Sequence, residues 1–179
     1  MKKNDMTKLI VTNALLVALC VVLTLISNYI PIGGITINLA LITIAIAAIL
    51  YGYKSAIFVG LVNGGIVMFA AQAFFAISPI GTVIVCLLKS SLAGVCAALI
   101  YNLLKKKNHH LGVILATIIV PIINTTIFII GSLIFFNGVF GELISLFVAA
   151  NFIIEFVINL LLSPSIYYIV NQFKKRRMA

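Results

Sequence analysis

The sequence has very few charged residues for its length. Only 15 of its 179 side chains are charged, 12 basic and three acidic, so the charged fraction is 8% against roughly 25% in soluble domains. Apolar residues make up 64%, against roughly 45–50% in soluble domains. A water-soluble fold of this size would have too few charged groups to cover its surface. We therefore predict an integral membrane protein.

The sequence also lacks the motifs of common catalytic sites. It has no G-x-x-x-x-G-K-[ST] phosphate loop, no H-E-x-x-H zinc motif and no G-x-S-x-G nucleophile elbow. Asp5 is the single aspartate, and the three cysteines lie within apolar runs without a C-x-x-C pair. We therefore expect a protein that is not an enzyme, holds no metal and carries no catalytic cofactor.

Long apolar runs divide the sequence into candidate membrane helices. Crossing a hydrocarbon core of about 30 Å takes about 20 apolar residues in a helix. The six candidate spans are residues 9–27, 38–53, 55–77, 80–104, 111–136 and 143–170. The second is short, so we expect it to lie obliquely or to be only partly inserted. The prediction is an all-α integral membrane protein, a compact bundle of six transmembrane helices that forms a single membrane domain over residues 1–179.

The basic residues predict the orientation of this bundle. With six spans, 11 of the 12 lie at one membrane face, while the other face carries only Glu142. Because cytoplasmic segments are rich in Lys and Arg, we expect both termini in the cytoplasm of a multi-pass cell-membrane protein. Basic residues at segment ends, without aromatics between them, argue against nucleic-acid binding. The 11 residues are Lys2, Lys3, Lys8, Lys54, Lys105, Lys106, Lys107, Lys174, Lys175, Arg176 and Arg177.

Two ionisable residues are predicted to lie within the membrane. Lys89 lies ten residues after Pro79, or about 15 Å from the outer end of its span at 1.5 Å per residue. Glu155 lies thirteen residues after Glu142, or about 20 Å from the outer end of its span. Charged groups in hydrocarbon cost at least ~2.5–3.5 kcal/mol, so such residues tend to have a partner and a function. A structural Lys–Glu bridge and a solute site both fit, and they are not exclusive.

Further polar residues accompany these two. Asn151, Glu155 and Asn159 recur every fourth residue, so they share one helix face that either joins helices or forms a pocket wall. One cation and one anion among neutral polar groups suit a polar organic metabolite better than a metal ion, which would need clustered carboxylates. The candidate substrate-binding residues are Lys89, Glu155, Asn151, Asn63, Asn124, Asn38 and Gln72.

Pairs of small residues suggest close helix packing. Ala14 and Ala18 form A-x-x-x-A in the first span, and Gly60 and Gly64 form G-x-x-x-G in the third. Such pairs let helix backbones approach closely. They indicate either packing inside the bundle or docking to another membrane subunit.

Together these features resemble the substrate-binding S components of energy-coupling factor (ECF) transporters. The resemblance covers nearly the whole chain, although its individual motifs are loose. It lies in the six short spans, the A-x-x-x-A pair and the segments 49–56 (ILYGYKSA), 88–94 (LKSSLAG), 151–155 (NFIIE) and 163–165 (SPS).

The resemblance implies a substrate-binding subunit that captures a vitamin-like solute from outside. It implies a membrane coupling subunit, contacted by Ala14 and Ala18, and two cytoplasmic ATPase subunits that alone use ATP. It further implies that residues 28–37 form a lid over a solute site in the outer half. The substrate is not specified, and pantothenate, riboflavin and pyridoxine-like compounds all remain open. With no Trp, ring stacking would depend on Tyr29, Phe69 or Phe74.

Two other functions compete with this interpretation. A self-sufficient small transporter or channel, active as an oligomer, would also explain the intramembrane charges. An accessory membrane protein would need Lys89 and Glu155 only for structure. Dependence on partner subunits separates these hypotheses.

Overall fold

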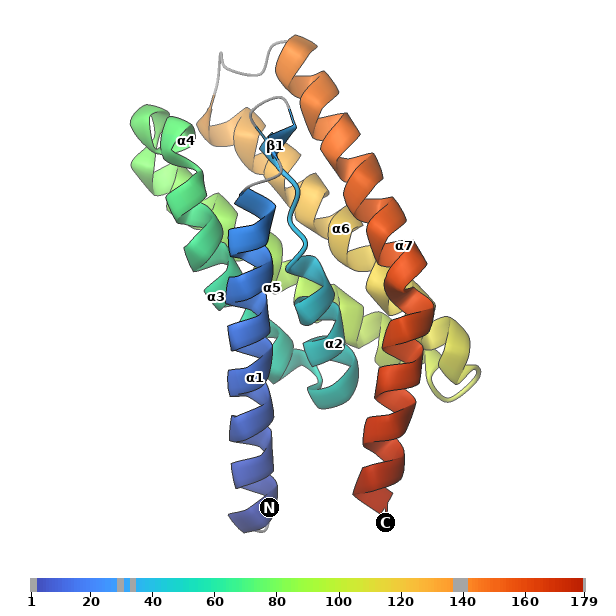
Figure 1. Cartoon of the computed structure of the whole chain (residues 1–179). Helices are drawn as coiled ribbons and strands as arrows, with labels where there is room; N and C mark the ends of the chain where they lie inside the picture. The colour runs from blue at the N-terminus through green and yellow to red at the C-terminus, as the bar shows by residue number, and fades with distance from the viewer. Residues whose placement is uncertain (1–2, 29–30, 33–34, 137–141, 179) are drawn as a thin grey trace.

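The structure, a computed structural model, describes the backbone of residues 3–28, 31–32, 35–136 and 142–178, and the side chains of residues 7, 9–27, 37–136 and 147–173. It is almost entirely helical (Figure 1). The helices are α1 (Lys3–Asn28), α2 (Leu41–Tyr51), α3 (Tyr53–Ala70), α4 (Gln72–Ile77), α5 (Pro79–Leu104), α6 (His109–Phe135) and α7 (Glu142–Met178). Two short antiparallel strands, β1 (Pro31–Ile32) and β2 (Ile35–Thr36), lie between α1 and α2.

The surface of the bundle is apolar, as a lipid-facing surface must be. Among the described residues, five helices are long and apolar enough to cross a membrane: α1, α3, α5, α6 and α7. Large apolar side chains point outward from them, and the four most exposed, all above 70% exposed, are Phe69, Ile80, Leu103 and Leu161. The structure thus supports a multi-pass, all-helical membrane protein.

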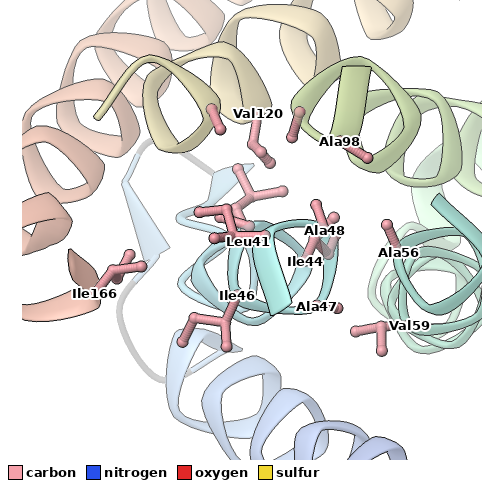
Figure 2. Packing of buried hydrophobic residues seen from close by; sticks show 14 of the residues in the cluster. Leu41, Ile44, Ile46, Ala47, Ala48, Ala56, Val59, Ala98, Val120 and Ile166 are labelled. Carbon is pink, nitrogen blue, oxygen red and sulfur yellow. The ribbon is translucent and has the colours of Figure 1, made fainter. Parts of the chain in front are cut away.

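The second predicted span, residues 38–53, is only partly helical. Its helix, α2, has 11 residues and is therefore about 16 Å long, too short for a hydrocarbon core of about 30 Å. Eight of the 11 residues are buried, because α2 contacts α1, α3, α5, α6 and α7. Figure 2 shows it at the centre, with Leu41 and Ile44 facing side chains of the surrounding helices. The six-helix count is therefore not confirmed: among the described residues five helices are long enough to span the membrane, and α2 is a short central helix.

The two ends of the chain lie on the same side of the bundle. In Figure 1 the first turn of α1 and the last turn of α7 are close to the same end, while β1 lies toward the opposite end. Five long helices alone would leave the two ends on opposite sides. The segment from Ile37 to Tyr51, which is non-helical up to Ala40 and helical from Leu41, returns the chain after α1 and so keeps the ends together.

The third predicted span, residues 55–77, is also not one helix. Helix α3 ends at Ala70, and Ala71 leaves the helical conformation before the six-residue α4 begins. The local sequence contains no proline or glycine at this point, so propensity does not account for the break. Tertiary packing does, because α4 brings Phe74 against Phe128 and Phe136 of the α6 region, with ring centroids 5.7 Å and 5.0 Å apart.

The four remaining predicted spans coincide with long helices, and two of these helices start at a clear N-cap. The span 80–104 corresponds to α5, which begins with Pro79 after an N-cap at Ser78, whose hydroxyl accepts the backbone N–H of Gly81. The span 111–136 corresponds to α6, for which Asn108 is the N-cap. The first span lies within α1, and the last lies within α7, which continues to Met178.

Helices α3 and α5 pack in very close contact through the glycine pair. A Cβ atom on Gly60 would lie 2.7 Å from the backbone oxygen of Ser90, and one on Gly64 would collide with the backbone oxygen of Cys86. The G-x-x-x-G motif therefore mediates packing inside the bundle, and its alternative interpretation as a docking surface is wrong. This contact sets the position of α5, which carries Lys89.

Candidate functional site: a polar cavity between the helices

A cavity of about 120 Å³ lies in the half of the bundle away from the two chain ends. Its wall comes from the end of α1, the start of the α2 segment, the end of α3, α4, and the facing parts of α5, α6 and α7. The lining residues with polar side chains are Thr24, Ser27, Asn38, Thr82, Cys86, Lys89, Asn124, Thr125, Asn151 and Glu155. Helices distant in sequence thus contribute to one polar site.

The non-helical backbone before α2 forms part of this wall. Inside a membrane protein every backbone N–H needs a partner, and irregular backbone is tolerated where it lines a cavity or is enclosed by protein. The N–H of Asn38 donates to Oε1 of Glu155 at 2.8 Å, and the N–H of Leu39 donates to the Ser27 hydroxyl at 3.1 Å. Side chains of α7 and α1 therefore accept the backbone N–H groups of the non-helical segment before α2.

Glu155 is held in place by its neighbours on α7 as well. Asn151 Nδ2 donates to the same Oε1 atom at 3.0 Å, and Asn159 Nδ2 donates to the backbone oxygen of Glu155 at 2.8 Å. The Glu155 side chain is only 2% exposed. Asn151, Glu155 and Asn159 therefore interact along one face of α7. Glu155 also connects α7 to the backbone just before α2.

Lys89 lies on another part of the cavity wall, beside aromatic rings. Its Nζ lies 5.1 Å from the ring centroid of Phe128, within the range of a cation–π contact. Phe74 packs edge-on against the same Phe128 ring. Lys89 and Glu155 form no ion pair within the described part of the chain, although both line the cavity. The structure thus does not show the direct bridge considered above.

Unpaired polar atoms are concentrated at this cavity. Eight buried side-chain nitrogen or oxygen atoms of the described residues have no hydrogen-bond partner, and five of them belong to residues that line the cavity. Native proteins leave few such groups, and each calls for an explanation such as strain, a catalytic role or a bound water or ion. The five atoms are Asn38 Nδ2 and Oδ1, Asn124 Oδ1, Asn151 Oδ1 and Glu155 Oε2.

Two residues predicted to bind substrate do not line the cavity. Asn63 is fully buried, donates from Nδ2 to the Ser90 hydroxyl at 2.9 Å, and faces Thr24 Oγ1 with its Oδ1. It connects α1, α3 and α5. Gln72 is exposed on α4. We therefore leave both residues out of the proposed site.

Several cavity residues were not predicted from the sequence. Thr24 and Ser27 on α1 and Thr82 on α5 belong to the wall, but hydroxyl residues are common in membrane helices and gave no distinct signal. Of the three rings considered for stacking, Phe74 lines the cavity, whereas Phe69 is 78% exposed and Tyr29 lies outside the described residues.

The predicted docking residues lie on the outside of the bundle. Ala14 and Ala18 are both exposed on α1, whose apolar span is the least buried of the five candidates. Among its exposed neighbours Leu15 is 65% exposed. A face with small residues next to larger apolar ones is available to lipid or to a helix of another subunit.

Comparison with known protein families decides the identity. The family model described as "ECF transporter, substrate-specific component" matches residues 8–174. The chain belongs to this family. The match includes every helix that contributes to the cavity. No curated protein and no solved structure gave a match.

Family membership confirms the resemblance inferred from the sequence. ECF S components are subunits of transporters rather than enzymes, and the family implies a coupling module, ATPases and a small-molecule substrate. Residues 28–37, predicted to be the lid, are described only in part, as the backbone of Asn28, the β1–β2 backbone pair and Ile37. The lid therefore stays a prediction for this ECF subunit.

Proposed function

We propose that this ECF subunit captures a vitamin or a related small polar metabolite from outside the cell and delivers it to partner subunits. The observation that carries the proposal is the cavity whose lining residues hold five unpaired buried polar atoms. Its volume of about 120 Å³ approaches that of the roughly 150 Å³ cavity that takes up benzene in another protein. This size favours a single-ring or short-chain solute over one as large as riboflavin.

The proposed orientation places both chain ends in the cytoplasm of a cell-membrane protein. Lys105, Lys106 and Lys107 connect α5 to α6, at the ends of these helices farther from the cavity. Because basic connections favour the cytoplasmic side, the cavity then lies in the outer half of the membrane. In this arrangement the chain passes through the bundle six times, and the second passage is the interrupted segment that includes α2.

The proposed partners are a membrane coupling subunit, which docks on the α1 face at Ala14 and Ala18, and two cytoplasmic ATPases. The sequence contains no phosphate-binding loop, so the subunit itself uses no ATP in this proposal. Family membership favours this partner-dependent mechanism over a self-sufficient oligomeric transporter or channel. The subunit needs no catalytic cofactor.

Partner dependence tests the proposal. A tagged form of the chain, solubilised gently from its own membrane, should retain a second membrane subunit and ATPase subunits. Vesicles that contain this complex should accumulate solute only when ATP is hydrolysed. A chain that moves solute alone in ATP-free proteoliposomes would support the oligomeric transporter instead.

A further inference from the structure

The cavity has acceptors on one wall and a donor on another, and this pattern defines a chemical class of solute. Resting on the proposed binding function, we propose that the solute is amphoteric. It is a single-ring or short-chain metabolite that carries an amino group bound by Glu155 and Asn151 and an acidic group bound by Lys89.

The α7 wall offers acceptors. Glu155 Oε1 already accepts two N–H groups, from the Asn38 backbone and from Asn151 Nδ2. The atoms left without partners are Glu155 Oε2 and Asn151 Oδ1, which belong to two residues one helical turn apart. Two neighbouring acceptors are best satisfied by one group with two or more N–H donors, whereas a single hydroxyl can satisfy only one of them. This favours an amino or amidine group.

The α5 wall offers the one charged donor among the described lining residues. Lys89 is half-buried, and its Nζ lies 5.1 Å from the centroid of the Phe128 ring. An ammonium group has three donors and no acceptor, so a solute group beside it must accept hydrogen bonds. An acidic group would form charge-assisted bonds with Lys89, which are roughly twice as strong as neutral ones.

The rest of the wall suits the middle of such a solute. Phe74 and Phe128 supply ring surface, while the amides of Asn38 and Asn124 have unpaired atoms for a carbonyl, a hydroxyl or a ring nitrogen. The five unpaired atoms are covered by neighbouring protein atoms. Binding therefore requires side-chain rotation at the wall, and the solute supplies the partners that these atoms lack.

The balance of charge excludes other classes. Among the described residues, one basic and one acidic side chain line the cavity, so an amphoteric solute satisfies both without adding net charge. A solute with only acidic groups would leave Glu155 Oε2 without a donor, and one with only amino groups would leave Lys89 without an acceptor. A buried polar group left without a hydrogen-bond partner weakens binding, and a charged group does so more strongly.

Three matched probes test this inference on the purified, solute-free chain in nanodiscs. These are 4-(aminomethyl)benzoate, 4-methylbenzoate and 4-methylbenzylamine, which share one ring and differ only in the end groups. Calorimetry should give a dissociation constant for 4-(aminomethyl)benzoate at least tenfold lower than for either other probe. Equal binding of 4-methylbenzoate or 4-methylbenzylamine, or binding of none of the three, would overturn the proposal.

Variants assign each end group to its wall. Glu155→Gln should remove the preference for the amino group, and Lys89→Met should remove the preference for the acid, each by at least tenfold. Lys105→Met, which changes an exposed lysine outside the cavity, is the matched control and should change neither preference. If Glu155→Gln does not fold, Asn151→Leu replaces it, because this variant removes the other acceptor.

The outcome is independent of the test of the proposed function. A chain that retains its ATPase partners, yet binds the probes without regard to their amino group, would contradict the amphoteric solute and leave the transporter function intact. Loss of both partners and binding would contradict both.

Discussion

The carboxyl group of Glu155 accepts the backbone N–H of Asn38 at 2.8 Å, across 117 residues of sequence. This bond joins the longest helix to the point where the chain leaves extended structure and enters the central helix α2. It also brings both residues into the cavity wall. One carboxyl group therefore supports the interrupted backbone with one oxygen and has its second oxygen unpaired.

Glu155 variants should separate these two functions. Glu155→Gln keeps an oxygen that can accept the Asn38 N–H, whereas Glu155→Ala leaves that buried N–H unpaired at a cost of about 1–3 kcal/mol. We expect Glu155→Ala to lower thermal stability in nanodiscs clearly more than Glu155→Gln. Equal melting temperatures for the two variants would show that the bond does not support the fold.

Adjacent glycines on α3 provide a matched pair for the helix contact. Gly64→Ala puts a Cβ atom against the Cys86 backbone and should destabilise the fold by about 1–3 kcal/mol. Gly65→Ala meets nothing within 4 Å and should be neutral or stabilising by up to about 1 kcal/mol. Thermal unfolding of both variants in the same detergent measures the difference. A destabilised Gly65→Ala with an unchanged Gly64→Ala would contradict the close packing of α3 and α5.

Large side chains on the α1 face should block transport but not binding. Ala14→Trp and Ala18→Trp fill the surface on which we propose that the coupling subunit docks, so ATP-dependent uptake should fall to background. Solute binding to the isolated variants should stay within about twofold of the parent, because neither residue lines the cavity. Leu161→Trp is the control, since Leu161 is 71% exposed on α7. Loss of uptake in the control alone would place the docking surface elsewhere.

Removal of the Lys89 side chain should weaken binding while the fold is kept. Lys89 forms no direct ion pair among the described residues, so Lys89→Ala breaks no salt bridge within the bundle. If it bonds an acidic group of the solute, its loss costs about 1.5–3 kcal/mol, or roughly 10- to 150-fold in the dissociation constant. Calorimetry measures the affinity, and thermal unfolding checks the fold. An unfolded variant would mean that Lys89 is structural.

Periodicity and composition predicted much of this fold from the sequence. The long apolar runs predicted α5 and α6 close to their observed ends and lie within the longer α1 and α7, because lipid exposure requires continuous apolar helices. The two errors lie where tertiary contacts decide. The segment 38–53 is helical only from Leu41, since side chains from α1 and α7 accept the backbone N–H groups of its non-helical start. The break at Ala71 depends on aromatic packing with α6, which no local pattern indicates.

The candidate site could be predicted only in part for a similar reason. Lys89, Asn124, Asn151 and Glu155 are rare polar residues in apolar helices, so their inward orientation follows from the cost of exposing them to lipid. Asn63 also points away from lipid, but it forms hydrogen bonds with neighbouring helices instead of lining the cavity. The sequence does not distinguish a polar residue that bonds another helix from one that lines a cavity. Only the arrangement of helices shows which polar groups share a cavity.

Native mass spectrometry of the tagged chain, released gently from its own membrane, tests the central claim most directly. The claim predicts a chain that carries one small molecule of a mass typical of a single-ring or short-chain metabolite, and the double variant Lys89→Met, Glu155→Gln should lose it. A parent chain that is correctly folded but always empty, while it retains neither coupling nor ATPase subunits, would contradict a solute-capturing ECF component.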